Sequence, residues 1–136
     1  MANFSKTAYY EKKMLNHTLL NEPYTPPTQL YLALFTADPG REGSTVNEIS
    51  DPAYARQPIA FMAATDDPTS GSYCQNALNI GYSQATMNWG HVVYGAIMDA
   101  ATGGNMLYKG PFDVPKEVLE DDFFEIPAGE IKVVED

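Results

Sequence analysis

Two histidines and a few paired carboxylates are the residues whose types could carry chemistry in this chain. A hydrolytic triad needs a nucleophile, a base within hydrogen-bond reach and an orienting acid, and only His17 and His91 could serve as the base. His17 falls near the end of an expected helix, where a surface contact is the ordinary role. His91 begins an expected strand, and no serine lies in a G-x-S-x-G turn. We therefore expect no catalytic residues.

Metal and cofactor sites are not indicated either. Asp66-Asp67 and Asp121-Asp122 are adjacent in sequence, and neighbours in an extended chain point to opposite faces, unlike the carboxylate pair of a glycosidase. Cys74 and two distant histidines lack the clustering of a zinc site. The loop Asp66–Gly71 only faintly resembles a calcium loop, and the sequence leaves open whether it binds an ion. We expect no metal ligands, no cofactor-binding residues and no cofactor.

The charge of the chain excludes two classes of partner. Its 136 residues carry 8 Lys and Arg against 18 Asp and Glu, a formal net charge of −10. A protein that binds nucleic acid needs a basic surface to displace counterions from phosphate, and anionic lipid would be repelled in the same way. We therefore expect neither nucleic acid nor membrane as a partner. The single cysteine fits folding in a reducing cytoplasm.

One N-terminal helix is expected. Ser5 can cap it, and the proline-rich segment from Glu22 to Thr28 ends it by removing backbone donors. Its apolar stripe at helical spacing consists of Phe4, Ala8, Leu15 and Leu19. The sequence predicts that residues 1–27 form a helix and a proline-containing connector, separate from a β domain over residues 28–136.

The β domain is predicted from short apolar or alternating segments at intervals of about ten residues, with turn residues between them. The expected strands are residues 29–36, 54–61, 77–80, 85–89, 91–98, 105–109, 123–126 and 130–134, the last two as a hairpin. We predict a mainly β fold, an antiparallel β-sandwich (Ig-like or jelly-roll type) of about seven or eight short strands with an N-terminal α-helix. The expected core is Leu32, Leu34, Phe61, Trp89, Tyr94, Ile97 and Leu107.

Several phrases of the sequence resemble a known family. Residues 30–40 read LYLALFTADPG, residues 47–50 read NEIS, residues 54–57 read YARQ, and residues 99–105 read DAATGGN. These phrases are similar to a family of small tailed-bacteriophage virion proteins that are usually labelled phage tail fibre proteins. The resemblance spans nearly the whole chain. It departs at Asp51-Pro52-Ala53, where the family leads us to expect a glycine-rich turn.

The resemblance implies a non-enzymatic structural component of a tailed-bacteriophage virion, a tail fibre or other tail-associated protein, located in the virion after assembly in the host cytoplasm. A capsid decoration or cement protein that joins neighbouring capsomers is the alternative, and a carbohydrate-binding module is a second alternative of another class. The expected partners are other virion proteins, from the tail or the major capsid protein. We also expect a homo-oligomer, with a trimer as the first guess, because virion sites repeat around symmetry axes.

The N-terminal segment is the expected attachment surface. Tyrosine combines an apolar body with a polar tip and suits interfaces. The predicted interface residues are Phe4, Ala8, Tyr9, Leu15, Leu19 and Tyr24. Three lysines in the first 22 residues could meet the acidic residues 113–136 of a neighbouring copy. The sequence leaves open the alternative that the helix caps an open end of its own sandwich.

Overall fold

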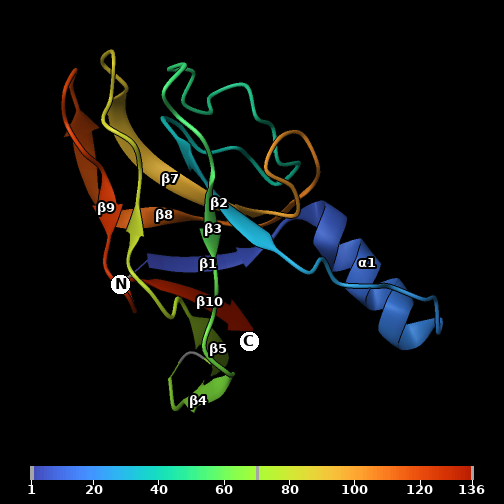
Figure 1. Ribbon diagram of the computed structural model, residues 1–136. Coiled ribbons are helices and arrows are strands. Elements are labelled where there is room, and N and C mark those ends of the chain that lie inside the picture. The colour runs from blue at the N-terminus through green and yellow to red at the C-terminus, as the bar shows by residue number, and fades with distance from the viewer. Residues whose placement is uncertain (1, 70, 136) are drawn as a thin grey trace.

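The chain folds into a mainly β structure with one helix near its N-terminus, in a computed structural model that describes residues 2–69 and 71–135. Strands make up 42% of it, as one curled eight-stranded sheet and a small second sheet, which confirms the predicted fold class (Figure 1). The large sheet has the order β3-β2-β7-β8-β1-β10-β5-β4. Its strands are β1 (Ala2–Lys6), β2 (Leu30–Phe35), β3 (Gln57–Ile59), β4 (Thr65–Asp67), β5 (Gly71–Gln75), β7 (Gly90–Met98), β8 (Met106–Val118) and β10 (Ile131–Glu135). The small sheet pairs β6 (Ile80–Gly81) with β9 (Glu125–Ile126), and the helix is α1 (Ala8–Leu19).

The first strand lies inside the large sheet. It runs parallel to β10, with Ala2 opposite Ile131, and antiparallel to β8, with Ser5 opposite Lys109. Ala2 and Phe4 are buried while Asn3 and Ser5 are exposed, the two-residue period of a strand. Residues 2–6 therefore belong to the sheet and not to the separate N-terminal segment that we predicted.

The start of the helix is corrected accordingly. Thr7, and not Ser5, is the N-cap, since its backbone is extended and its side-chain oxygen accepts a hydrogen bond from the Tyr10 N–H at 3.4 Å. Phe4 lies in β1, so the predicted helical stripe that began with it was wrong at this position. The helix ends before the connector, where Asn21 adopts a positive φ of 56°.

Two other predictions of strand structure were wrong. Residues 85–89 form no strand, and the last two strands do not pair with each other. Instead, β9 pairs with β6, while β10 lies between β1 and β5. The hairpin of β4 and β5 was missed because its polar strand sequences, TDD and GSYCQ, carry little of the apolar signal of a strand.

The core occupies both faces of the central strands. Leu32 and Leu34 pack into one buried cluster, while Ala33 and Phe35, on the other face of β2, pack into a second. Of the predicted core, five side chains are buried: Leu32, Leu34, Trp89, Ile97 and Leu107. The other two, Phe61 and Tyr94, are half-buried against these clusters.

A glycine permits the approach of β1 to β8. A Cβ atom added at Gly110 would lie 2.3 Å from the backbone oxygen of Asn3, far closer than any ordinary contact. Because this position has no side chain, β1 can lie against β8 and carry Phe4 into the core. The start of α1 is thereby fixed at one end of the sheet (Figure 1).

Candidate functional site

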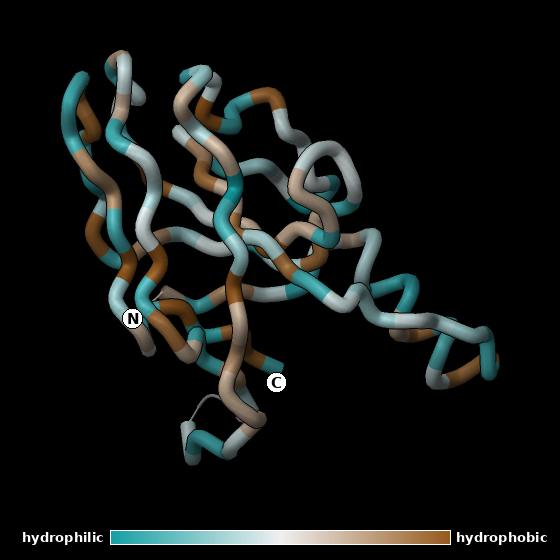
Figure 2. The backbone as a smooth tube through the Cα atoms, in the orientation of Figure 1, coloured by the Kyte–Doolittle hydropathy of each residue, from teal (hydrophilic) through white to brown (hydrophobic). Residues whose placement is uncertain are grey.

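Among the described residues, hydrogen bonds from the start of the helix α1 tie it to the sheet and to the neighbouring loop. Thr7 and Ala8 are buried, the Thr7 hydroxyl donates to the carbonyl of Met106 at 2.6 Å, and the Ala8 N–H donates to the carbonyl of Arg41 at 3.0 Å. Beyond its first turn the helix projects from the sheet (Figure 1). Its later apolar side chains are exposed, with Leu15 at 56% and Leu19 at 72%. Figure 2 shows hydrophobic segments on this projecting part.

The proline-containing connector returns along the helix and packs against it. The ring of Tyr10 lies edge-on to the rings of Tyr24 and Tyr108, at centroid distances of 5.7 and 5.1 Å. A ring nitrogen of His17 lies 2.7 Å from the carbonyl oxygen of Glu22. Burial raises the pKa of Tyr24 to about 12, and the electrostatic effect of the nearby Tyr10 contributes to this rise. The helix and its connector therefore form one ordered unit.

A groove of about 580 Å³ lies beside this helix, where α1 faces β1 and β10. Its apolar lining consists of Met14, Leu15, Leu19 and Val134. Its charged lining consists of Lys6, Glu11, Lys12, Arg41 and Glu135. We call this surface the helix groove. It combines exposed leucines with charges at the rim, the composition of a protein-binding surface.

The charges of the helix groove are partly paired. Lys6 forms an ion pair with Glu135, and the Arg41 Nη2 lies 2.6 Å from Glu11 Oε1. Lys12 makes no ion pair within the described residues 2–69 and 71–135. The groove holds three of the eight Lys and Arg residues of the chain, so it is a locally basic surface on an acidic protein.

The structure separates the six predicted interface residues. Leu15 and Leu19 line the helix groove, whereas Tyr9 and Tyr24 are half-buried outside it. Phe4 and Ala8 are 0% and 2% exposed. They offer no surface to a partner, because both are buried in the fold of their own chain, which corrects the prediction for these two residues.

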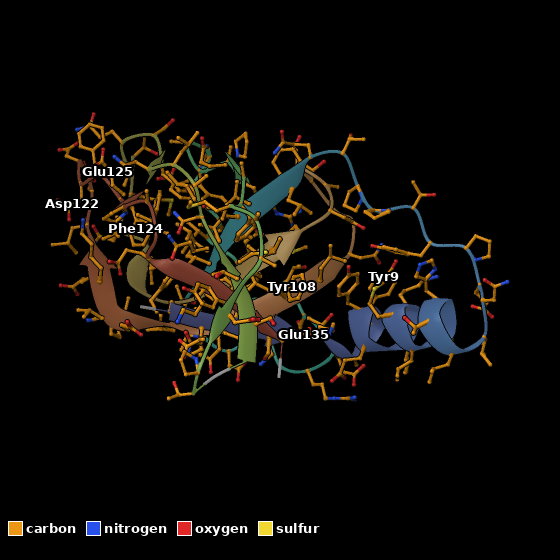
Figure 3. The ribbon with its side chains drawn as sticks, turned by 90° about the horizontal axis from the view of Figure 1, so that it is seen from below. Tyr9, Tyr108, Asp122, Phe124, Glu125 and Glu135 are labelled. Atoms are coloured by element: carbon orange, nitrogen blue, oxygen red, sulfur yellow. The ribbon has the colours of Figure 1, made fainter. Side chains whose placement is uncertain are left out.

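A second surface of interest is the turn between β8 and β9 with the adjoining strand ends, which we call the acidic tip (residues 117–125). It carries the acids Glu117, Glu120, Asp121, Asp122 and Glu125. Two apolar side chains project among them, Leu119 at 44% and Phe123 at 58% exposure. Figure 3 places Asp122 and Glu125 at the opposite end of the molecule from α1 and Tyr9.

Backbone hydrogen bonds hold the acidic tip in place. The Asp121 N–H donates to the carbonyl of Ala85 at 2.8 Å, and the Ala85 N–H donates to the carbonyl of Asp122 at 2.9 Å. The Leu119 N–H donates to Asp122 Oδ2 at 2.9 Å. Asp121 itself adopts a positive φ of 73°. The tip is therefore an ordered turn, and sequence reasoning saw only its charge.

Sequence reasoning also missed a buried network around Arg56. Its Nη1 donates to the carbonyls of Ala100 and Gly103 at 2.9 and 2.8 Å, while its Nε donates to Glu48 Oε2 at 2.8 Å. The Tyr54 hydroxyl donates to the same carboxylate oxygen at 2.7 Å. Three phrases that carried the resemblance, NEIS, YARQ and DAATGGN, therefore meet in one structural cluster.

Asp51, where the sequence departs from the resembled family, is buried and charged. Its carboxylate accepts hydrogen bonds from the Trp89 indole N–H at 2.8 Å and from the Thr86 N–H at 2.7 Å. Burial alone raises the pKa of Asp51, but the hydrogen bonds from Thr86 and Trp89 lower it more, and the net pKa lies well below its usual range. This carboxylate ties residues 51–53 to the segment before β7.

The other candidate residues are not brought together. His17 lies on α1, whereas His91 is exposed on β7. In the loop Asp66–Gly71, Asp67 accepts from the Thr69 N–H at 2.9 Å and lies 3.2 Å from the Lys132 Nζ, while Ser70 lies outside the described residues.

Across residues 2–69 and 71–135, no group of three or more His, Cys, Asp or Glu is placed to hold a metal ion. No helix in this part of the chain is long and apolar enough to cross a membrane.

Comparison with protein families gives one match that covers nearly the whole chain. The family described as Podophage GP4 fiber I protein gp80 matches residues 5–134, from β1 through β10. A search of curated proteins finds no match. The match confirms the resemblance that the sequence phrases indicated. The chain belongs to the Podophage GP4 fiber I protein gp80 family, a phage tail fibre family, and is thus a structural protein of a phage fibre.

Proposed function

We propose that this chain is a non-enzymatic component of a phage tail fibre that attaches to its neighbours in the virion through the helix groove. Membership of a fibre family supports a structural role in the virion and favours neither capsid decoration nor carbohydrate binding. The proposed attachment site rests on one observation: Leu15 and Leu19 are exposed on a helix whose first turn is hydrogen-bonded to the rest of the chain.

The exposed leucines supply the driving force for docking. Fully burying a leucine side chain contributes about 1.5–3 kcal/mol relative to leaving it in water. Leu15 and Leu19 lie one helical turn apart, so one partner can cover both. A partner seated in the helix groove would also contact Val134 at the sheet end.

The order of the helix supports the same role. Tyr10 packs between Tyr24 and Tyr108, which holds the connector and the helix in a fixed arrangement before any partner binds. A surface that is already ordered loses less conformational entropy on binding than a flexible arm. The helix is therefore suited to act as a rigid docking element.

Incorporation into phage particles tests this function. A phage that does not make this chain would be grown in cells that supply one of three versions of it. The versions are the double variant Leu15→Asp with Leu19→Asp, the variant Val46→Asp, and the unchanged chain. Val46 is 81% exposed and does not line the helix groove, so it is the matched control for adding a carboxylate to an exposed apolar position. Circular dichroism would check that all three chains are folded.

We expect the groove variant to be at least tenfold less abundant in purified particles, because two charged groups would have to be buried in the contact. The Val46→Asp chain should be incorporated like the unchanged chain. Normal incorporation of the groove variant would contradict the proposed function.

A further inference from the structure

We propose that the helix groove binds the acidic tip of a second copy of this chain, in a head-to-tail contact. This inference rests on the proposed function, in which the groove is an attachment surface, and it names the partner. The occupant is thus residues 117–125 of another copy, with Phe123 as its apolar anchor.

Charge complementarity favours this partner. The helix groove holds Lys6, Lys12 and Arg41 against two acids, and Lys12 has no ion-pair partner within residues 2–69 and 71–135. The acidic tip carries five acids. One cation lies beside them, Lys116, whose Nζ donates to the carbonyl of Phe123 at 2.8 Å, so the tip remains acidic overall. Two copies that each carry a net charge of −10 repel on most surfaces, so a contact between copies is favoured where the cations of the groove meet the acids of the tip.

Apolar complementarity gives the contact its centre. Phe123 is 58% exposed on the tip, and Leu15 and Leu19 are exposed in the groove. An aromatic side chain that enters an apolar groove with charged residues around it has the arrangement of a protein-interface hot spot. The tip is ordered by its hydrogen bonds to Ala85, so little conformational entropy would be lost when it docks.

The placement of the two surfaces decides the kind of assembly. The groove is lined by residues of α1. Figures 1 and 3 show α1 at one end of the molecule and the segment that leads into β9 at the other, where Figure 3 labels Asp122 and Glu125. One copy therefore cannot fill its own groove. Each copy offers one groove and one tip, so the contact is heterologous and generates a closed ring or an open chain of copies.

Mixing two defective variants tests this contact. The groove variant, Leu15→Asp with Leu19→Asp, keeps an intact tip, and the tip variant, Leu119→Asp with Phe123→Asp, keeps an intact groove. All four positions are at least 44% exposed, so the substitutions should leave the fold unchanged. Light scattering coupled to gel filtration would give the mass of each variant, of their equimolar mixture and of the unchanged chain.

We expect the unchanged chain and the Val46→Asp control to form assemblies larger than one chain, and each defective variant alone to have the 15.0 kDa mass of a monomer. The mixture should contain a dimer of one copy of each variant, with twice that mass, because one intact groove and one intact tip remain. A monomeric mixture, a monomeric unchanged chain up to its solubility limit, or assembly of either variant alone would overturn the head-to-tail contact.

The two proposals fail separately. If the groove variant is lost from virions while the mixture stays monomeric, the groove binds a different virion protein and only the head-to-tail contact is wrong. If the groove variant enters virions normally, the proposed attachment function is wrong whatever the mixture does.

Discussion

Arg56 contacts Glu48 at two points, with Nε 2.8 Å from Oε2 and Nη2 2.9 Å from Oε1. The remaining donor, Nη1, holds the carbonyls of Ala100 and Gly103 in the loop between β7 and β8. Because this cluster unites three of the phrases that resemble the fibre family, those three phrases describe the scaffold of the fold. The helix groove and the acidic tip, which we propose bind each other, lie outside this cluster.

Breaking this pair should destabilise the chain strongly. The Arg56 and Glu48 side chains are 6% and 14% exposed, so Arg56→Met would leave a largely buried carboxylate without its cationic partner, with only the Tyr54 hydroxyl still donating to it. We expect the free energy of unfolding, measured in urea, to fall by about 3–5 kcal/mol. The control is Arg41→Ala, whose side chain is 66% exposed in its pair with Glu11 and should cost less than about 1 kcal/mol. Equal losses for the two variants would refute this explanation.

The burial of Phe4 predicts that the first residues are essential for folding. Phe4→Ala would open a cavity between β1 and its neighbours and should cost about 3–5 kcal/mol in the same urea measurement. Leu19→Ala, on the exposed part of α1, should change stability by no more than about 0.5 kcal/mol. If Phe4→Ala were as harmless as Leu19→Ala, β1 would not be a member of the sheet.

The close approach of β1 to β8 can be tested at a single glycine. Gly110→Ala would place a Cβ atom 2.3 Å from the Asn3 oxygen, and we expect a loss of about 1–3 kcal/mol as the strands separate. Gly81→Ala is the control, because its Cβ would meet only the Glu125 side chain at 3.7 Å and should shift stability by less than about 1 kcal/mol. A neutral Gly110→Ala would show that β1 does not lie where the structure has it.

Asp51 should make stability depend on pH in the acid range. Its native pKa lies below the unfolded value of about 3.9, so its stabilising effect is fully present above that value and is lost as the pH falls toward the native pKa. Asp51→Asn should be less stable than the unchanged chain at neutral pH and should lose less stability between about pH 5 and pH 2. Urea midpoints across this range would measure both effects. Parallel pH profiles would mean that Asp51 is not the charged group responsible.

The elements that the sequence predicted correctly are those with a strong local signal. The continuous apolar run LYLALF predicted β2, and the alternation from His91 to Met98 predicted β7. The helix was predicted because apolar spacing precedes a proline-rich segment. β1 was missed because its five residues, three of them polar, fit the start of a helix as well as a strand. Its partners β8 and β10 also lie more than 100 residues away in the sequence.

In the candidate site, too, the sequence could indicate the residues with a local signal but not those that depend on contacts with distant segments. Leu15 and Leu19 could be selected from their helical spacing alone, whereas the burial of Phe4 and Ala8 depends on contacts with distant strands. The pairing of Arg56 with Glu48 and with the loop at Gly103 has no local signature either, because it forms only when three separate segments meet. The charge of the acidic tip is evident in the sequence, but its position opposite α1 follows from the fold.

A reconstruction of the intact phage particle by electron cryomicroscopy, with this chain traced, tests the central claim most directly. We predict that the chain lies in a tail fibre and that protein density covers Leu15 and Leu19 in the helix groove. A chain located on the capsid, or a helix groove open to solvent in the assembled particle, would contradict this account.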